Sequence, residues 1–406
     1  MPELMELSIS DIAYQGKGVA RLDGKVVFVS GVISGETVLA EPLTAHKKFT
    51  EARLVSIKTP SADRIKPVCP LAYRVGCQSN SFCPGCCYQH MDYKTELDSK
   101  LKQFRDLLKR LGGISLPDPP PRIQSGPCYD YRNKITLHGF SGTEKPILGY
   151  FTDDNRSVLD VPACPLAYPA INSKLAELRK DPKFMAGLST HMKVMFRHTE
   201  KDGVVFWTSR DTNRPPMMTE STPFGDLKVS ADSFFQVNHR IMEKLLQAVS
   251  EIVSKSKPRK VIDLYCGTGL FAIAASKSGA GEVIGIDFDH AAIETAGLNA
   301  TANGVRNARF ISSAVSKITE SFYAELKGSG VTMIVDPPRR GMDPEVLSGI
   351  AKAMPDELIY ISCAPDTLAR DIKVLIASGY TLASTSLLDM FPRTQYFESI
   401  SLLKKG

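Results

Sequence analysis

The chain has 406 residues, which is too long for one ordinary hydrophobic core, so two or three domains are expected. Hydrophobic residues make up 43% of the sequence and charged residues 23%, a globular composition that excludes an intrinsically disordered chain. The formal net charge of +6 is compatible with a polyanionic partner and equally with a plain basic surface, so charge alone does not assign a function.

The sequence shows no signal for secretion or membrane insertion. Its first residues, Met-Pro-Glu-Leu-Met-Glu-Leu, lack a basic region followed by an apolar one, and no stretch reaches the roughly 18 apolar residues of a membrane span. We therefore expect a cytoplasmic protein without membrane contact. In that compartment the nine cysteines should be free thiols or metal ligands rather than disulfides.

Residues 1–60 are predicted to form a small β-barrel of the OB type. Runs rich in β-branched residues, such as "KVVFVSGVIS", are broken by glycine, and a turn at Gln15-Gly16-Lys17-Gly18 separates two of them. Such barrels are a common platform for nucleic acids. The segment His46-Lys47-Lys48-Phe49 adds basic and aromatic side chains at one edge, where they either bind RNA or protect an exposed strand.

Residues 61–235 are expected to form a central, mixed α+β domain that carries a group of cysteines. An amphipathic helix over 93–111 follows the first five of these cysteines, and Gly112-Gly113 ends it. This helix either belongs to the central domain or packs on the one that follows. The pentapeptide Cys-Pro-Leu-Ala-Tyr occurs twice in this region, at 69 and at 164.

Residues 236–406 alternate between strand-like and helix-like segments. This order predicts an α/β domain with a parallel, doubly wound sheet that binds ligands at the carboxyl ends of its strands. The last two strands have no room for a helix between them and should form an antiparallel pair. The expected strands are "KVIDLY", "GEVIGIDF", "ARFISS", "VTMIVDPP", "ELIYISC", "YTLASTSLL" and "YFESISLLKK".

A glycine-containing turn after the first of these strands predicts a nucleotide-like ligand. In "VIDLYCGTGLF" the strand runs into Gly267-Thr268-Gly269 at a helix start, where backbone amides can approach a ligand closely. Asp287 ends the next strand, 20 residues after Gly267, where a ribose diol would be held. The third glycine of the dinucleotide fingerprint is missing, which disfavours a nicotinamide cofactor.

Several motifs in order resemble one enzyme family. "ADSFFQVN", "DLYCGTGLF", "DPPRRG", "YISCAP" and "MFPRTQYFESISLL" are similar to the RNA uracil-C5-methyltransferases, which use S-adenosylmethionine and have the Rossmann-like class I methyltransferase fold. The resemblance covers almost the whole chain, including an N-terminal TRAM domain and a cysteine cluster like that of the ribosomal RNA branch. It implies that five residues contact the methyl donor: Gln236, Tyr265, Leu270, Asp287 and Asp336.

Two of these residues have plain structural alternatives. Gln236 could cap the helix that begins near Asn238, and Tyr265 could belong to the core. Leu270 stands where the family often has asparagine, so its contact with the donor would be apolar.

The chemistry of uracil methylation needs a nucleophile and a base. Carbon 5 of uracil is weakly nucleophilic until a thiolate adds to carbon 6, and a base must later remove the C5 proton. Cys363, at the end of a predicted buried strand, is the expected nucleophile, although buried strand cysteines are more often inert. Glu398, which interrupts the last apolar strand, is the expected base, and Tyr396 stands where the family usually has histidine.

The cysteine cluster is predicted to hold a metal. Cys77-x5-Cys83-x2-Cys86 with Cys164 supplies four thiolates, which suit zinc as well as iron. The resemblance to the ribosomal branch favours a [4Fe-4S] cluster. Cys69 also lies near the family's first ligand position, but Cys77 has the family's spacing to Cys83 and is preferred here.

The sequence leaves several alternatives open. Large-subunit 23S ribosomal RNA is the favoured substrate, with transfer RNA as the alternative, and no obligatory protein partner is indicated. Arg339 and Arg340 either contact RNA phosphate or order their loop. Two other functions are alternatives. An amine methyltransferase would have no chemical need for Cys363, and a non-catalytic RNA-binding iron–sulfur protein would be unaffected by its replacement.

Overall fold

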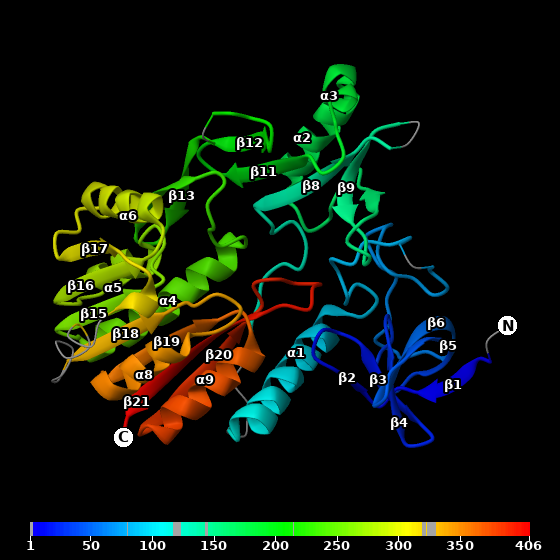
Figure 1. Ribbon diagram of the computed structural model, residues 1–406, viewed down its shortest axis with the longest axis horizontal. Helices are drawn as coiled ribbons and strands as arrows, with labels where there is room; N and C mark the ends of the chain where they lie inside the picture. The colour runs from blue at the N-terminus through cyan, green and yellow to red at the C-terminus, as the bar shows by residue number, and fades with distance from the viewer. Residues whose placement is uncertain are drawn as a thin grey trace.

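The structure is a computed structural model that describes residues 3–78, 80–116, 123–142, 145–213, 215–318, 322 and 330–406. The N-terminal barrel and the C-terminal sheet lie side by side with helix α1 between them, and a smaller sheet extends from their common edge (Figure 1). In the described part of the chain, no helix combines the length and the apolar character that crossing a bilayer requires.

The N-terminal barrel is a six-stranded sheet in the order β1-β5-β6-β4-β3-β2. Its strands alternate buried and exposed residues, so Leu7, Val27 and Leu54 fill the interior. Buried Glu36 closes one end, where it accepts the Ile33 amide and pairs with Arg64. The strands are β1 Met5–Ser8, β2 Asp11–Ile12, β3 Gly18–Leu22, β4 Lys25–Val29, β5 Thr37–Ala45 and β6 Phe49–Thr59.

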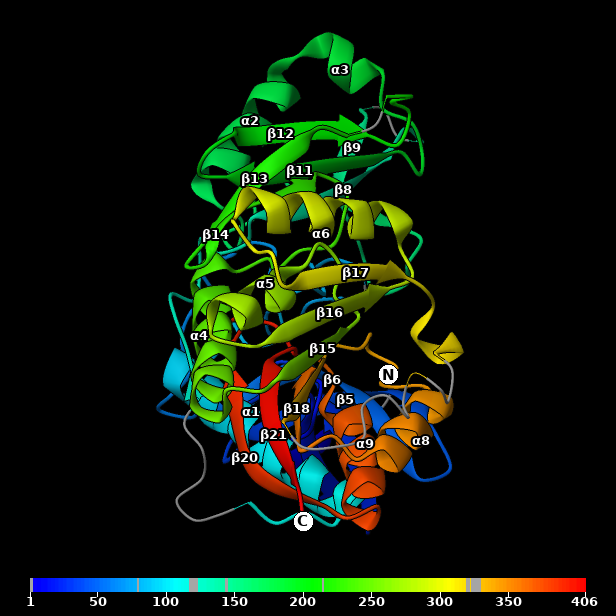
Figure 2. The same cartoon turned by 90° about the vertical axis from the view of Figure 1, so that its left-hand side faces the viewer.

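The central region contains a five-stranded antiparallel sheet in the order β10-β9-β8-β11-β12, with α2 and α3 packed beside it (Figure 2). Pro169 and Pro182 start the two helices, where a missing amide hydrogen costs nothing. The elements are β8 Lys134–Phe140, β9 Ile147–Phe151, β10 Val158–Asp160, α2 Pro169–Lys180, α3 Pro182–Ala186, β11 Lys193–Thr199 and β12 Gly203–Thr208.

The C-terminal domain has the predicted α/β architecture. Its eight-stranded sheet runs β17-β16-β15-β18-β19-β21-β20-β7; the first five strands are parallel, and β21 is antiparallel to both of its neighbours. The strands are β7 Ile123–Gln124, β15 Lys260–Leu264, β16 Glu282–Asp287, β17 Ala308–Ser312, β18 Val331–Val335, β19 Glu357–Ser362, β20 Tyr380–Leu388 and β21 Glu398–Lys405.

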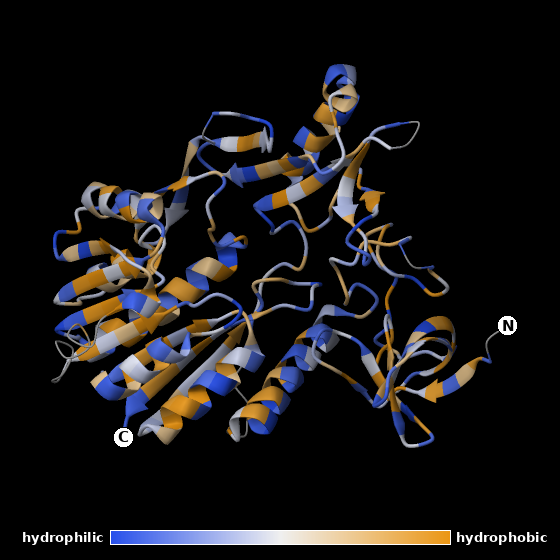
Figure 3. Cartoon of the chain, viewed as in Figure 1, coloured by the Kyte–Doolittle hydropathy of each residue, from blue (hydrophilic) through white to orange (hydrophobic). Residues whose placement is uncertain are grey.

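Helices cover both faces of this sheet. Helices α4 and α5 pack on one face, and α8, α9 and α1 pack on the other. The central strands are largely hydrophobic, whereas α4 and α9 carry one hydrophobic and one hydrophilic stripe (Figure 3). The helices are α1 Tyr93–Leu107, α4 His239–Ser256, α5 Leu270–Lys277, α6 His290–Ala302, α8 Pro344–Ala353 and α9 Pro365–Ala377.

The β-hairpin of β13 Met217–Thr222 and β14 Gly225–Ser230 falls within the range expected for the central domain. Its buried residues Met218, Leu227 and Val229 nevertheless belong to the core formed with α4 and α5. The C-terminal packing unit therefore begins before this hairpin.

Helix α1 joins the C-terminal domain through buried charges. It ends at Leu107, continues as the π-helical turn η1 Leu108–Gly112, and stops where Gly113 takes a φ of 70°. Phe104 and Leu108 pack into the core beneath α9. Lys100, which is fully buried, donates to Glu96 at 2.7 Å and to Asp389 at 2.8 Å, so the helix is tied to the loop after β20.

This buried pairing predicts a large loss of stability when Lys100 is replaced. Lys100→Met leaves the buried Asp389 without its cation and Glu96 with Arg393 alone, so the free energy of unfolding should fall by about 3–5 kcal/mol in chemical denaturation. Lys94→Met is the matched control on the same helix, because Lys94 pairs with Asp98 in full exposure and its loss should not move the transition. Equal effects of the two substitutions would contradict the structural role given to Lys100.

Candidate active site

The carboxyl edge of the parallel strands gathers the predicted catalytic residues. Asp336 directly follows β18, and Cys363 directly follows β19. Strands β19 and β21 pair up to Ser362 and Ser399, so Cys363 and Glu398 occupy the next position of the ladder. The thiol, the Glu398 carboxyl and Asp336 act on one another electrostatically. The structure thus brings together three residues that are up to 62 positions apart in the sequence.

The Cys363 thiol lies in an environment that disfavours its ionisation. Desolvation, followed by the charges of Glu398 and Asp336, raises its pKa to about 12. Arg339 opposes this shift, because its positive charge favours the thiolate. Arg339 is therefore the neighbour that favours the thiolate, a role that the sequence alone did not assign.

Glu398 is a carboxyl group held away from water. It is 5% exposed, and its Oε2 atom has no hydrogen-bond partner among the described residues. Desolvation, and next the charge of Asp336, raises its pKa well above the ordinary range. Desolvation likewise raises the pKa of Asp336 to about 7. Such carboxyl groups are stronger bases once ionised than exposed ones.

The glycine turn after β15 forms the second part of the edge. Gly267 donates its amide to Asp287 Oδ2 at 2.9 Å, and Tyr265, with a φ of 66°, donates its amide to the Ile286 carbonyl at 2.9 Å. Leu270 is the first residue of α5, after Gly269 with a φ of 89°. Left-handed backbone at these positions turns the amides toward the strand ends, which suits a polar ligand.

Asp263 is an additional buried acid beneath this turn. It is fully buried, and neither carboxylate oxygen has a hydrogen-bond partner among the described residues. Desolvation, followed by the charge of Asp336, raises the pKa of its carboxyl well above the ordinary range. An unpaired buried carboxylate is costly, so this group favours a proton or a donor supplied by a ligand.

Gln236 lies on the loop between β14 and α4 and is buried. The cap of α4 is Asn238, whose side chain accepts the Ile241 amide, so Gln236 does not have the capping role considered above. The Asn238 amide also donates to the Met390 carbonyl at 3.3 Å. The Gln236 loop is thereby attached to the loop that precedes Glu398.

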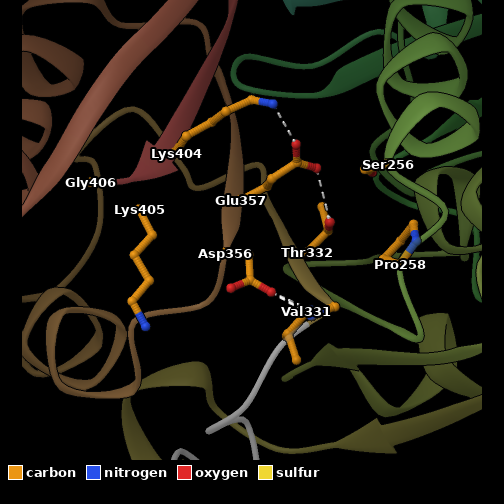
Figure 4. A pocket seen from close by; sticks show the side chains of 10 residues that line it. Ser256, Pro258, Val331, Thr332, Asp356, Glu357, Lys404, Lys405 and Gly406 are labelled. Carbon is orange, nitrogen blue, oxygen red and sulfur yellow. Dashed lines mark hydrogen bonds and ion pairs between the residues drawn. The ribbon is translucent and has the colours of Figure 1, made fainter.

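A cavity of about 490 Å³ opens at the opposite edge of the same sheet (Figure 4). The residues that line it include none of the predicted catalytic residues. Its charged groups are used within the fold. Glu357 accepts from Lys404 at 2.9 Å and from Thr332 at 3.2 Å, while Asp356 accepts the amides of Gly330 and Val331.

Four cysteines line one small cavity, but they are not the four that spacing predicts. The cavity is lined by Cys69, Cys83, Cys86 and Cys164, together with Gln89 and Tyr150. Cys77 lies elsewhere, and its sulfur accepts the Arg74 amide at 3.3 Å. Cys77, the preferred ligand, is thus not among the residues that line this cavity, whereas Cys69 is.

A backbone hydrogen bond explains why Cys69 lies near Cys83 although the two are far apart in the sequence. The Cys83 amide donates to the Leu71 carbonyl at 2.7 Å, which brings the segment just after Cys69 against Cys83. Cys69 and Cys164 are the first residues of the two Cys-Pro-Leu-Ala-Tyr pentapeptides, so the repeat was the signal that could have identified the pair.

The donor set of this cavity suits a metal, although the thiols are not arranged as a closed ligand group. Within the described ranges, no set of three or more Cys, His, Asp or Glu side chains meets the geometry of a metal site. Desolvation raises the pKa of Cys83 to about 11, and the Cys164 thiol adds to that shift. Four mutually repelling thiols fit a cation that would hold them as thiolates. The buried Gln89 Nε2 atom, for which the described part of the chain supplies no hydrogen-bond partner, is also suited to a sulfide or thiolate acceptor.

Replacing Glu398 by a neutral residue should make the Cys363 thiol more reactive toward an alkylating reagent. Glu398→Gln removes the charge that raises the thiol pKa most after desolvation, so a larger fraction of Cys363 is ionised at a given pH. Alkylation by iodoacetamide, followed on the Cys363 peptide by mass spectrometry, should become faster in this variant across mildly alkaline pH. A slower or unchanged alkylation rate would contradict the electrostatics described here.

Comparison with known proteins gives the class and then the family. Residues 225–406 match the tRNA (uracil-5-)-methyltransferase family model, and residues 3–55 match the TRAM domain, as predicted for the N-terminal barrel. A tRNA (uracil-54, C5)-methyltransferase of Pyrococcus abyssi, solved with S-adenosyl-L-homocysteine, superposes with a TM-score of 0.74 at 24% identity, covering 98% of this chain and 100% of that one.

Curated relatives span the whole chain. An uncharacterized RNA methyltransferase of Caldanaerobacter subterraneus is 31% identical over 99% of this chain and 98% of its own length. A 23S rRNA (uracil(1939)-C(5))-methyltransferase of a Marinomonas species is 29% identical, covering 99% of this chain and 95% of that enzyme.

The fold and the carboxyl-edge site define a class I S-adenosylmethionine-dependent methyltransferase. Within that class the chain belongs to the RNA uracil-C5-methyltransferase family and carries an N-terminal TRAM domain.

Proposed function

We propose that this enzyme methylates carbon 5 of a uracil in 23S ribosomal RNA, with Cys363 as nucleophile and Glu398 as base. One observation carries the proposal: a thiol and a desolvated carboxyl group stand side by side at the edge of the sheet where the glycine turn and Asp336 meet. The chemistry needs these two functions close together, because they act in turn on adjacent ring carbons.

In the first step Cys363 adds to carbon 6. Arg339 favours the thiolate, the new bond joins sulfur to carbon 6, and the ring electrons move to carbon 5 and the O4 enolate. Carbon 5 then attacks the methyl group, a carbon–carbon bond forms, and the sulfonium–methyl bond breaks to give S-adenosylhomocysteine. Glu398 next accepts the C5 proton; the released electron pair restores the C5–C6 double bond and expels the Cys363 thiolate.

The methyl donor would lie across the glycine turn. Asp287 keeps lone pairs for the two ribose hydroxyls, although it already accepts the Gly267 and Asp289 amides. Phe288, directly after Asp287, is 76% exposed and offers an apolar face for the adenine. Tyr265 and Leu270 flank the turn, and Gln236 and Asp336 would complete the contacts with the donor.

The RNA would enter with the target base unstacked, since a stacked uracil cannot reach Cys363. Phe234, two residues before Gln236, is 79% exposed and could stack on a base. On the TRAM barrel the His46 and Phe49 rings stack with centroids 4.3 Å apart, next to exposed lysines. The whole-length 23S rRNA relative favours ribosomal RNA, and transfer RNA is the alternative that mapping of 5-methyluridine would identify.

We assign the cysteine cavity to a [4Fe-4S] cluster held by Cys69, Cys83, Cys86 and Cys164. The cluster would join three segments of the chain, those around Cys69, Cys83–Cys86 and Cys164. Methyl transfer moves no net electrons, so its contribution to this enzyme would be structural.

The roles of the two catalytic residues can be separated by trapping. Cys363→Ala should abolish methylation and any covalent complex with RNA, while its affinity for S-adenosylmethionine stays that of the parent. Glu398→Gln should slow turnover by about 10²–10⁴-fold and accumulate a denaturant-resistant adduct of RNA with the Cys363 peptide, because the C5 proton is not removed. The proposal would be overturned if Cys363→Ala methylated RNA at the parental rate, or if the parent protein did not methylate RNA.

The cluster assignment is tested by paired serine substitutions. Cys69→Ser in the anaerobically purified enzyme should lower the iron content and weaken the visible absorption band, whereas Cys77→Ser should leave both unchanged. The opposite result would restore Cys77 as the ligand. Zinc without iron in the parent would contradict the choice of metal.

A further inference from the structure

Two neighbouring arginines of the "DPPRRG" loop have different surroundings. Arg340 points to Asp343, with 3.2 Å between its guanidinium and the carboxylate, and 71% of its side chain is exposed. Arg339 is also exposed, but its Cζ atom lies 4.0 Å from the centre of the Tyr396 ring. The charge of the same guanidinium acts on Cys363, where it opposes the rise of the thiol pKa. Tyr396 and Cys363 therefore share one cation.

The backbone on both sides of this contact is well fixed. The Arg339 carbonyl accepts the Thr367 hydroxyl at 3.1 Å, and Gly341, with a φ of 77°, closes the turn by donating to the Pro338 carbonyl. On the other side the Tyr396 amide donates to the Thr394 hydroxyl, and the Tyr396 ring meets the edge of Phe391 at 6.3 Å between centroids. The ring is thus a supported platform two residues before Glu398.

The site needs such a platform because the other charges near the thiol are negative. Glu398 comes from β21 and Asp336 from the end of β18. Tyr14 of the barrel, whose ring lies 6.3 Å from Phe397, borders this group of residues, and the negative charge of Asp366 on α9 acts on Tyr14. Arg339 opposes these negative charges, because its guanidinium lowers the pKa of the Cys363 thiol. An arginine on an unsupported loop would lose much of this effect to side-chain freedom.

We propose that Tyr396 is a positioning residue whose aromatic face holds the Arg339 guanidinium against the Cys363 sulfur, so that the thiolate is available before RNA is methylated. The inference rests on the proposed function of Cys363 as nucleophile. Ionisation itself transfers the thiol proton to solvent and leaves the electron pair on sulfur. Tyr396 then stands in the family's histidine position without serving as an acceptor for the C5 proton, which goes to Glu398.

Rates of Cys363 alkylation test this directly. Iodoacetamide is applied to the full-length enzyme from neutral to alkaline pH, and the modified Cys363 peptide is quantified by mass spectrometry. Tyr396→Ala and Arg339→Gln should each slow alkylation at mildly alkaline pH by about tenfold, equivalent to about one unit in the thiol pKa. Tyr396→Phe keeps the aromatic face and should remain within about threefold of the parent.

The variants also separate this idea from a loss of folding and from a failure of the proposed function. Unchanged affinity for S-adenosylmethionine shows that Tyr396→Ala is folded, and its kcat for methylation should fall with the KM for the donor unchanged. Parental alkylation by Tyr396→Ala would overturn the inference, as would Tyr396→Phe behaving like Tyr396→Ala. Full methylation by Cys363→Ala would instead overturn the nucleophile assignment, whatever the alkylation profiles show.

Discussion

Burial of charge where helix α1 meets the loop after β20 organises the whole molecule. Lys100, Glu96 and Asp389 have no access to water, and Arg393 joins them by donating its amide to Glu96 at 2.7 Å. Such a group is stable only when every charge keeps its partner, so the loop has little freedom. The loop leads directly into Tyr396 and Glu398, and its geometry therefore determines the geometry of the site.

The same junction connects the cysteine cavity to the catalytic edge. The Arg393 carbonyl accepts the amides of Cys87 and Tyr88, which directly follow Cys86. The Arg393 side chain donates to the Met91 carbonyl at 2.9 Å and to the Cys128 sulfur at 3.4 Å. Arg393, which contacts the cysteine segment, precedes Tyr396 by three residues, so a change in that segment can reach the Tyr396 ring through the backbone. The TRAM barrel takes part as well, because Tyr14 packs against Phe397.

Much of the fold, and the proximity of Cys363 and Glu398, could be predicted from the sequence because the signals are local. A strand followed by Gly267-Thr268-Gly269 and a later Asp287 predicts a ligand-binding edge from spacing alone. Cys363 and Glu398 are residues of unusual chemistry at the ends of apolar strands, and the antiparallel register of the last strands places them together. The α/β architecture and the TRAM barrel follow from comparable patterns.

The features that could not be predicted depend on contacts between distant segments. Lys100 and Asp389 are 289 residues apart, and the pairing of β7 with β20 adds a strand from a segment with no strand signal. Arg339 in the sequence is one of two equivalent arginines, and only its position above Tyr396 shows which one serves the thiol. The position of Cys69 rather than Cys77 at the cysteine cavity has the same origin, because spacing along the chain does not give the distance between thiols in the fold.

The central claim is that this enzyme forms a bond at carbon 5 of uracil, and release of the hydrogen on that carbon tests it most directly. RNA labelled with tritium at C5 of uridine is incubated with the enzyme and S-adenosylmethionine, and tritium in water is measured beside methyl groups in RNA. The account predicts one tritium released for each methyl group transferred. Methylation without release of tritium would place the methyl group on another atom and contradict the account.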